Sequence, residues 1–238
     1  MPMYSLDNLE RHWRSTCRSF DDTFADCVAV FREMFRCASP ICSALAGRKA
    51  LEPNCVFVLL TKVLNHASAT FVLLQRGLLV DAALTSRNAV ETSLLLELLA
   101  KEPSLCGDWS RGKSFRPSDV RRRLAKLPSV ALGELIVDVT PDEYEDTRFG
   151  YDWMSRITHA NVESVGHAAQ KHDANIFELK IGGALSRPEI IAVTKVLGTC
   201  YLRAILTCAA AYAPELLQRE MFDELTRRLH DVKVGARA

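Results

Sequence analysis

The chain has 238 residues and a net charge of +1, with 48% hydrophobic and 25% charged residues. These proportions are typical of a soluble globular protein. A net charge so near zero excludes attraction of nucleic acid or acidic membranes by the whole-molecule field, so only a local basic patch could bind them. Glycine (11) and proline (9) are scarce, which favours long helices over a fold of short strands and turns.

Eight cysteines are spread along the chain without a Cys-x-x-Cys pair, which excludes a zinc ribbon and a thioredoxin motif. Most lie in apolar helical patterns, where a free cysteine behaves as a small hydrophobic residue, so we expect reduced thiols and a cytoplasmic protein. The first residues are polar and charged, unlike a signal peptide. The longest apolar stretch, residues 193–214, is interrupted by Lys195 and Arg203, so we expect no membrane span.

The first hundred residues predict three long helices, because apolar residues recur there at spacings of three and four. These helices cover residues 6–37, 54–75 and 78–101. Ser39-Pro40 is expected to break the helical pattern after the first. Gly77 separates the second helix from the third, which should stop at Glu102-Pro103.

The second half of the chain has weaker but readable signals. Ser118 is expected to cap a short helix. Thr140-Pro141 followed by Glu143 is a strong helix start, and this helix should run to about Gln170. Since one strand cannot make a sheet, the strand-like segment at 176–181 should be a small hairpin or an extended crossover. Two more helices are expected over residues 188–212 and 214–231.

We therefore predict an all-α fold, a multi-helix bundle of long amphipathic helices that forms a single domain over residues 1–238. Residues 1–52 would be the N-terminal helices, 55–170 the core that carries the motifs, and 184–231 a C-terminal helical pair. The hairpin or extended segment near 176–181 would be the only β structure.

The helix predicted over residues 78–101 is the most apolar long stretch, yet it carries two opposite charges. A helical projection places six residues on one stripe: Leu84, Arg87, Glu91, Leu94, Leu95 and Leu98. Such a stripe faces a core, so we expect Arg87 and Glu91 to be buried and paired one turn apart. A buried ion pair costs more in desolvation than it returns, which makes stability a poor reason for it and the pair a candidate site.

A second group of polar residues lies on the helix predicted over residues 140–170. Tyr151, Ser155 and His159 follow one another at i, i+4 spacing along the edge of its apolar face. A histidine in such a place is often structural. If the two helices pack together, however, Arg87 and Glu91 would join these residues in one polar network, because buried polar groups need partners. All five are therefore candidate catalytic residues.

A basic segment lies between these two helices. Its basic residues are Arg111, Lys113, Arg116, Arg121, Arg122, Arg123 and Lys126. They form either a solvated helix face or a surface that contacts phosphates. Trp109 could stack on a nucleic-acid base beside them.

These motifs suggest a family. The sequence R-N-A-V-E (87–91) together with Y-D-W-M-S-R-I-T-H-A-N (151–161) resembles uncharacterised bacterial all-helical proteins, and the basic segment adds to the resemblance. It spans roughly residues 55–170. Those proteins look like distant relatives of HEPN helical domains. The resemblance implies a helical fold. Many HEPN domains are ribonucleases of toxin, CRISPR and phage-defence systems, while others bind or scaffold. The resemblance therefore implies either ribonuclease activity or a binding or scaffolding role.

One feature of HEPN ribonucleases is missing from this chain. Their motif is an arginine followed, after four to six residues, by a histidine on the same helix, and no histidine here has such an arginine. Arg156 is only three residues before His159. A nuclease site would have to be assembled from Arg87 and His159 on separate helices.

Three functions stay open. The first is a helical interaction or regulatory module, in which the polar network fixes helix register without catalysis. The second is a metal-independent ribonuclease, with His159 as general acid or base and Arg87 holding the phosphate charge. The third is a metal site made by His159, Glu163 and His167, which share a helix face at i, i+4, i+8.

The partners follow from these functions. We expect no cofactor, and if the protein is an enzyme we expect a ribonuclease. The candidate partners are a second copy of the chain bound through helix packing, an RNA, or another protein, and no membrane.

Overall fold

The computed structural model describes residues 6–127, 169–173, 176–179, 187–217 and 219–232. Over these residues the all-α fold predicted from the sequence is confirmed, with eight α-helices packed as a bundle. The helices are α1 (Leu6–Thr23), α2 (Ala25–Leu45), α3 (Leu51–Gln75), α4 (Leu79–Lys101), α5 (Leu105–Ser110), α6 (Pro117–Leu124), α10 (Arg187–Tyr212) and α11 (Arg219–Asp231).

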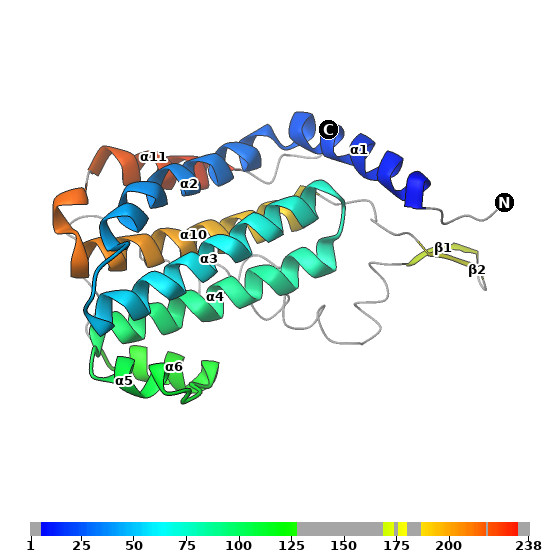
Figure 1. Cartoon of the computed structure of the whole chain (residues 1–238). Helices are drawn as coiled ribbons and strands as arrows, with labels where there is room; N and C mark the ends of the chain where they lie inside the picture. The colour runs from blue at the N-terminus through cyan, green and yellow to red at the C-terminus, as the bar shows by residue number, and fades with distance from the viewer. Residues whose placement is uncertain (1–5, 128–168, 174–175, 180–186, 218, 233–238) are drawn as a thin grey trace.

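The long helices α3 and α4 form an antiparallel pair, and α10 packs on both of them and on α2 (Figure 1). α11 covers α2 and α10 on the far side, while α5 and α6 attach to one end of the α3–α4 pair. The largest fully buried side chains include Tyr201, Phe31, Phe222 and Met34. The centre of the core is therefore α10, a segment distant in sequence from the helices that surround it.

The N-terminal region differs from the prediction, because the chain bends at Phe24 and not at Pro40. Phe24 has φ −120° and ψ 38°, outside the helical region, and its ring packs 5.0 Å from that of Phe20. Pro40 lies inside α2, although proline removes a backbone hydrogen bond there. The buried residues Ala38 and Ile41 on either side of Pro40 anchor the helix to the core, which offsets that loss.

The turn between α3 and α4 depends on a glycine, as the sequence predicts. Gly77 has a φ of +76°, a conformation that a side chain disfavours. The Leu78 N–H donates to the Leu73 carbonyl at 2.9 Å, and the Gly77 N–H donates to the Leu74 carbonyl at 2.9 Å. This is a Schellman motif, which satisfies the last carbonyls of α3 and sends the chain back along itself.

Two predicted helix starts and ends are wrong by a short distance. α6 begins at Pro117 with Arg116 as its cap, and not after Ser118, because the fixed φ of proline suits the first helical position. Ala169 and Gln170, predicted to be the last residues of a helix, lie instead in β1 (Ala169–Asp173), and the rest of that predicted helix lies outside the described residues. β1 pairs with β2 (Ile176–Leu179) in an antiparallel hairpin, with Lys171 opposite Phe177. This is the small hairpin that the sequence allowed.

The C-terminal pair is close to its predicted position. α10 begins one residue before the predicted 188 and ends at the predicted Tyr212. The last predicted helix is divided into the short 3-10 turn η1 (Pro214–Leu216) and α11. A Cβ placed on Gly198 would lie 2.3 Å from Leu229 of α11, so this glycine lets the two helices approach closely.

Two of the described helices, α3 and α10, are long and apolar enough to cross a membrane by length and composition. In α10, 78% of the most apolar window is buried inside the bundle, as in the core helix of a soluble protein, and in α3 the share is 33%. This test is weak support for a membrane span. It does show that the most apolar window of α3 has a smaller share of buried residues than that of α10.

All eight cysteines lie in described helices and are free thiols. Burial raises the pKa of Cys27, Cys37 and Cys106 to about 12. These thiols are therefore protonated at neutral pH and pack as small hydrophobic side chains. They are unreactive in this form, because the thiolate is the reactive form.

Candidate functional site

Arg87 and Glu91 form the ion pair expected from their spacing. The Arg87 Nε donates to Glu91 Oε1 at 3.1 Å across one turn of α4. Their side chains retain 25% and 23% of their exposure, so the pair lies at the edge of the bundle and is not in its interior. The expectation that both residues are largely buried is therefore confirmed only in part, because each side chain is mostly covered but neither lies in the core.

The predicted apolar stripe is rotated relative to the face that α4 buries. Leu84 is 42% exposed at one end of the stripe, whereas Leu98 at the other end is fully buried under α6. The buried face instead follows smaller residues, among them Ala82, Ser86 and Ala89. These residues let α3 and α10 approach α4 closely. Leu94 and Leu95 of the predicted stripe are only partly buried, whereas Leu96 and Leu99 lie in the core.

A different carboxylate of α4 is the buried one. Glu97 is 3% exposed and lies between α4 and α10. Arg203 of α10 donates to both of its oxygens, from Nε at 2.5 Å and from Nη2 at 3.0 Å. Lys101, one turn further along α4, lies 2.7 Å from the same carboxylate. Glu97, Lys101 and Arg203 together are called here the buried triad, after its buried carboxylate; the Lys101 side chain is 13% exposed and the Arg203 side chain 51%.

The buried triad keeps its carboxylate ionised. Burial alone would raise the pKa of Glu97, but the hydrogen bonds and charges of Arg203 and Lys101 outweigh it and hold the pKa below its ordinary value. A carboxylate with a depressed pKa is a poor proton donor or acceptor at neutral pH. The arrangement joins α4 to α10 and fixes their register, which is a positioning role and not acid–base chemistry.

The sequence held a signal for the buried triad that was not used. Glu97 is the only charge in the run L-L-L-E-L-L-A, and Arg203 interrupts the otherwise apolar second half of α10. Two lone opposite charges on strongly apolar helices have to be paired if both helices are buried. The two lone charges therefore predict, from the sequence alone, a contact between α4 and α10.

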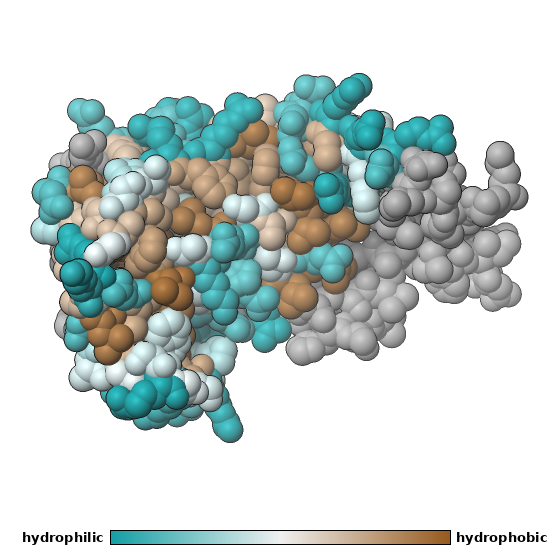
Figure 2. All heavy atoms as spheres, viewed as in Figure 1, coloured by the Kyte–Doolittle hydropathy of each residue, from teal (hydrophilic) through white to brown (hydrophobic). Residues whose placement is uncertain are grey.

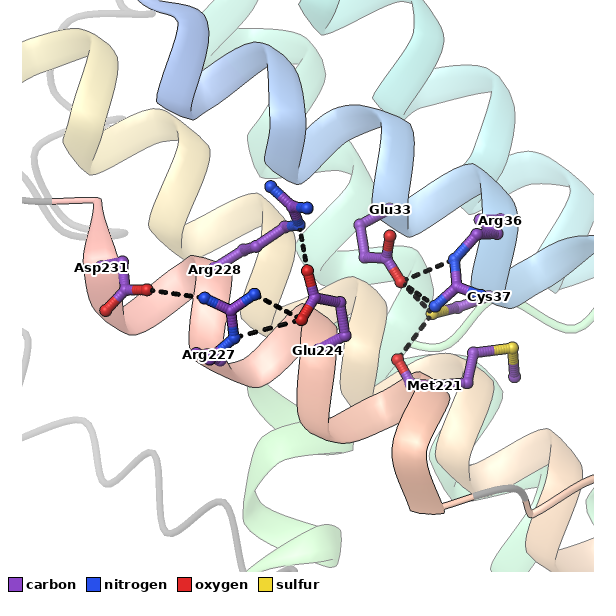
Figure 3. A network of polar contacts seen from close by, with 8 residues as sticks. All are labelled: Glu33, Arg36, Cys37, Met221, Glu224, Arg227, Arg228 and Asp231. Carbon is purple, nitrogen blue, oxygen red and sulfur yellow. Dashed lines mark hydrogen bonds and ion pairs between the residues drawn. The ribbon is translucent and has the colours of Figure 1, made fainter.

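A second polar network joins α2 to α11 (Figure 3). Glu33, 7% exposed, accepts hydrogen bonds from Arg36 one turn away. The Cys37 thiol lies 3.8 Å from the Glu33 carboxylate and 3.4 Å from the Met221 carbonyl oxygen of α11. Figure 3 also shows a separate group of ion pairs within α11, centred on Glu224. Of the contacts drawn, the one between Cys37 and Met221 links α2 to α11, whereas the Glu224 ion pairs lie within α11.

Tyr151, Ser155 and His159 lie outside the described residues, and so do Glu163 and His167 of the metal alternative. The predicted network with Arg87 and Glu91, and the catalytic roles, therefore remain predictions. Within the described ranges, no group of three or more histidine, cysteine or acidic residues is placed to hold a metal ion.

The basic segment forms α5, α6 and the loop between them, here called the basic arm (residues 105–127). All seven of its basic side chains are exposed. Val120 and Leu124 of α6 pack with Leu98 of α4 in a small apolar cluster, which turns the opposite side of α6 to solvent. The charged surface is therefore mounted on a fixed element of the bundle.

Several acidic residues neutralise part of the basic arm. Asp108 pairs with Arg111 at 2.8 Å and with Lys113 at 2.7 Å, and these hydrogen bonds lower the pKa of its carboxyl. Arg123 donates to both oxygens of Glu102 at 2.8 and 2.6 Å.

Trp109, the aromatic residue predicted to stack on a base, contacts the bundle as well as belonging to the basic arm. It is half-buried and packs against the main core, so it attaches α5 to the bundle. The stacking role for Trp109 remains an untested prediction, and the cationic side chains are the part of the basic arm that faces solvent.

Comparison of the chain with protein-family models, curated proteins and solved structures finds no match in any of the three.

Proposed function

We propose that the protein is a helical interaction module whose partner is a nucleic acid, held on the basic arm by its phosphates. The observation that carries the proposal is the separation of charge. Residues 105–127 contain seven basic and two acidic residues, a surplus of five positive charges, whereas the whole chain has a net charge of +1. The rest of the chain is therefore acidic overall, and its field directs a polyanion to this one surface.

The pairing within the basic arm leaves cations available for phosphates. Arg122 contacts Asp119 at 3.2 Å, but both side chains are more than half exposed. Exposed ion pairs contribute only about 0–1 kcal/mol, so a phosphate can displace such a carboxylate at little cost. Among the residues that the structure describes, no carboxylate pairs with Arg116 or Lys126.

The chemistry favours a nucleic acid over a single small anion. The basic side chains are spread over two short helices and a loop, so their charges suit a ligand with several phosphates in succession. Each phosphate that is neutralised releases condensed counterions, which is the main source of affinity in such contacts. Sequence-independent binding with a strong dependence on salt is the expected behaviour.

The test measures binding of a fluorescently labelled single-stranded RNA by anisotropy over a range of salt concentrations. A variant with Arg116→Ala, Arg122→Ala and Lys126→Ala should bind about 10- to 100-fold more weakly at low salt. Since each lost phosphate contact lowers the slope of log affinity against log salt by about 0.7, the slope should fall by about 2.

A control separates a local surface from net charge alone. It removes three positive charges from exposed residues of α1 and α2, by Arg14→Ala, Arg18→Ala and Arg32→Ala. The control should bind RNA as the unaltered protein does. Equal loss in both variants, or no RNA binding at low salt, would contradict the proposal.

A further inference from the structure

The outer face of α3 carries exposed hydrophobic side chains. Four of the five exposed large hydrophobic side chains lie on α3 and the start of α4, and Val58 and Val72 of α3 are 53% and 40% exposed. Figure 2 shows hydrophobic side chains interspersed with polar ones over α3 and α4 on the face toward the viewer. Exposed apolar side chains along one helix face favour contact with another protein or a membrane.

The exposed residues of α3 follow a spacing that suits packing against another helix. The α3 stripe is Val58, Lys62, Asn65, Ala69 and Val72, all of them exposed. Their separations alternate between four and three residues, which is the seam of two helices that pack along their length. Ala69 is small and allows close approach, while the single asparagine is a residue type that fixes register in such seams.

The α3 stripe is also nearly symmetric about its central residue. Val58 lies seven residues before Asn65, and Val72 lies seven residues after it. Two-fold contacts require that if one residue meets a second across the interface, the second meets the first. We infer that two copies of the chain pair through antiparallel α3 helices, with Asn65 at the two-fold axis and each Val58 against Val72 of the partner subunit.

Two hydroxyl groups that flank the α3 stripe tolerate this burial. Beside the axis, the Thr61 hydroxyl donates to the Phe57 carbonyl at 2.9 Å, and the Ser68 hydroxyl donates to the Leu64 carbonyl at 3.0 Å. Both hydroxyl groups thus have a hydrogen-bond acceptor within α3, so covering them leaves no donor without a partner. The Asn65 amide has both a donor and an acceptor, so two copies on the axis satisfy each other.

The charges at the two ends of α3 select the antiparallel orientation. Glu52 lies in the first turn of the helix, and Arg76 is its C-cap. Antiparallel pairing about Asn65 brings Arg76 within a turn of Glu52 of the partner subunit, whereas parallel pairing would bring the two Arg76 residues together. The helix dipoles also favour antiparallel packing, because each positive end then lies beside a negative end.

The interface is small, so the dimer should be reversible and dependent on concentration. Sedimentation velocity of the full chain over a range from about 1 to 200 µM measures the association directly. Val58→Lys should raise the dissociation constant of the dimer by about tenfold or more, since it places a charge against the apolar side chain of Val72 of the partner subunit. Adding Val72→Glu to the same chain should restore the dimer, because each new lysine then meets a glutamate of the other copy.

The outcomes are distinguishable. A protein that stays monomeric at the highest concentration overturns self-association and assigns the α3 stripe to a different partner or a membrane. A dimer that survives Val58→Lys overturns the use of α3, and a loss that Val72→Glu does not restore overturns the antiparallel register. Phe35→Lys, on the exposed part of α2, is the matched control and should leave the dimer intact. Thermal melting checks that each variant is folded.

Discussion

Replacing Arg203 with methionine tests whether the buried triad holds α10 in the bundle. The change keeps the apolar stem of the side chain and removes both hydrogen bonds to Glu97. The carboxylate, 3% exposed, then retains only Lys101 as a partner. We expect the free energy of unfolding to fall substantially, because the loss leaves a buried charge incompletely paired.

The size of the effect follows from the geometry. A hydrogen bond to a charged group contributes about 1.5–3 kcal/mol, and two such bonds are lost. Lys101 still neutralises the carboxylate, and the Arg203 side chain is 51% exposed, so solvent already screens part of the interaction. We therefore expect about 2–4 kcal/mol for Arg203→Met and about 1–2 kcal/mol for Lys101→Met, which leaves the two-bond contact from Arg203 intact.

Urea denaturation at neutral pH, followed by circular dichroism, measures these differences. Combining Arg203→Met with Glu97→Leu should recover part of the loss, since no buried carboxylate is then left unpaired. Arg14→Ala is the control for an exposed ion pair and should change stability by less than about 0.5 kcal/mol. An Arg203→Met protein as stable as the unaltered chain, or a double variant with fully additive losses, would refute the reasoning.

Four further predictions concern single groups. Because the pKa of Glu97 is depressed in the folded protein, the ionised carboxylate contributes to the free energy of unfolding. This contribution is fully present above about pH 4.5 and is lost as the pH falls through the pKa of the folded protein. Glu97→Gln should therefore flatten the dependence of unfolding free energy on pH in that window. Glu91→Ala should cost only about 0.5–1.5 kcal/mol in urea denaturation, since its pair with Arg87 is at the bundle edge; a loss as large as that of Arg203→Met would place it in the core. Gly77→Ala should cost about 1–2 kcal/mol by the same measurement, because alanine is strained at a φ of +76°, and an unchanged midpoint would mean that the turn relaxes. If the protein is a ribonuclease, His159→Ala should abolish cleavage of labelled RNA and destabilise by no more than about 1–2 kcal/mol; a folded, fully active variant excludes that role.

The helix positions could be predicted largely from the sequence, because they depend on local chemistry. Gly77 ends α3 through its own backbone freedom, and Pro103 follows the end of α4 by two residues, as expected. Pro40 shows the limit of the local argument. Its cost to the helix is real, but buried residues of α2 on both sides of it hold the helix together, and that compensation comes from the tertiary fold.

The candidate site was harder to predict, because α4 is apolar over most of its circumference. α3, α10 and α6 each cover part of it, so several projections give an apolar stripe of similar quality. The chosen stripe contained Arg87 and Glu91 and missed Glu97, whose burial depends on Arg203 more than a hundred residues later. Pairing between distant charges is information that a helical projection of one segment does not contain.

The central position of α10 has a consequence for the order in which the chain matures. α3 and α4 are complete at residue 101, but the helix that fills the space against them ends at Tyr212, about 110 residues later. At a synthesis rate of about 5–20 residues per second, the inner faces of the earlier helices stay uncovered for about 5–20 s. Packing of the core must therefore wait until α10 has been synthesised, and during that interval the uncovered apolar faces of the nascent chain favour aggregation.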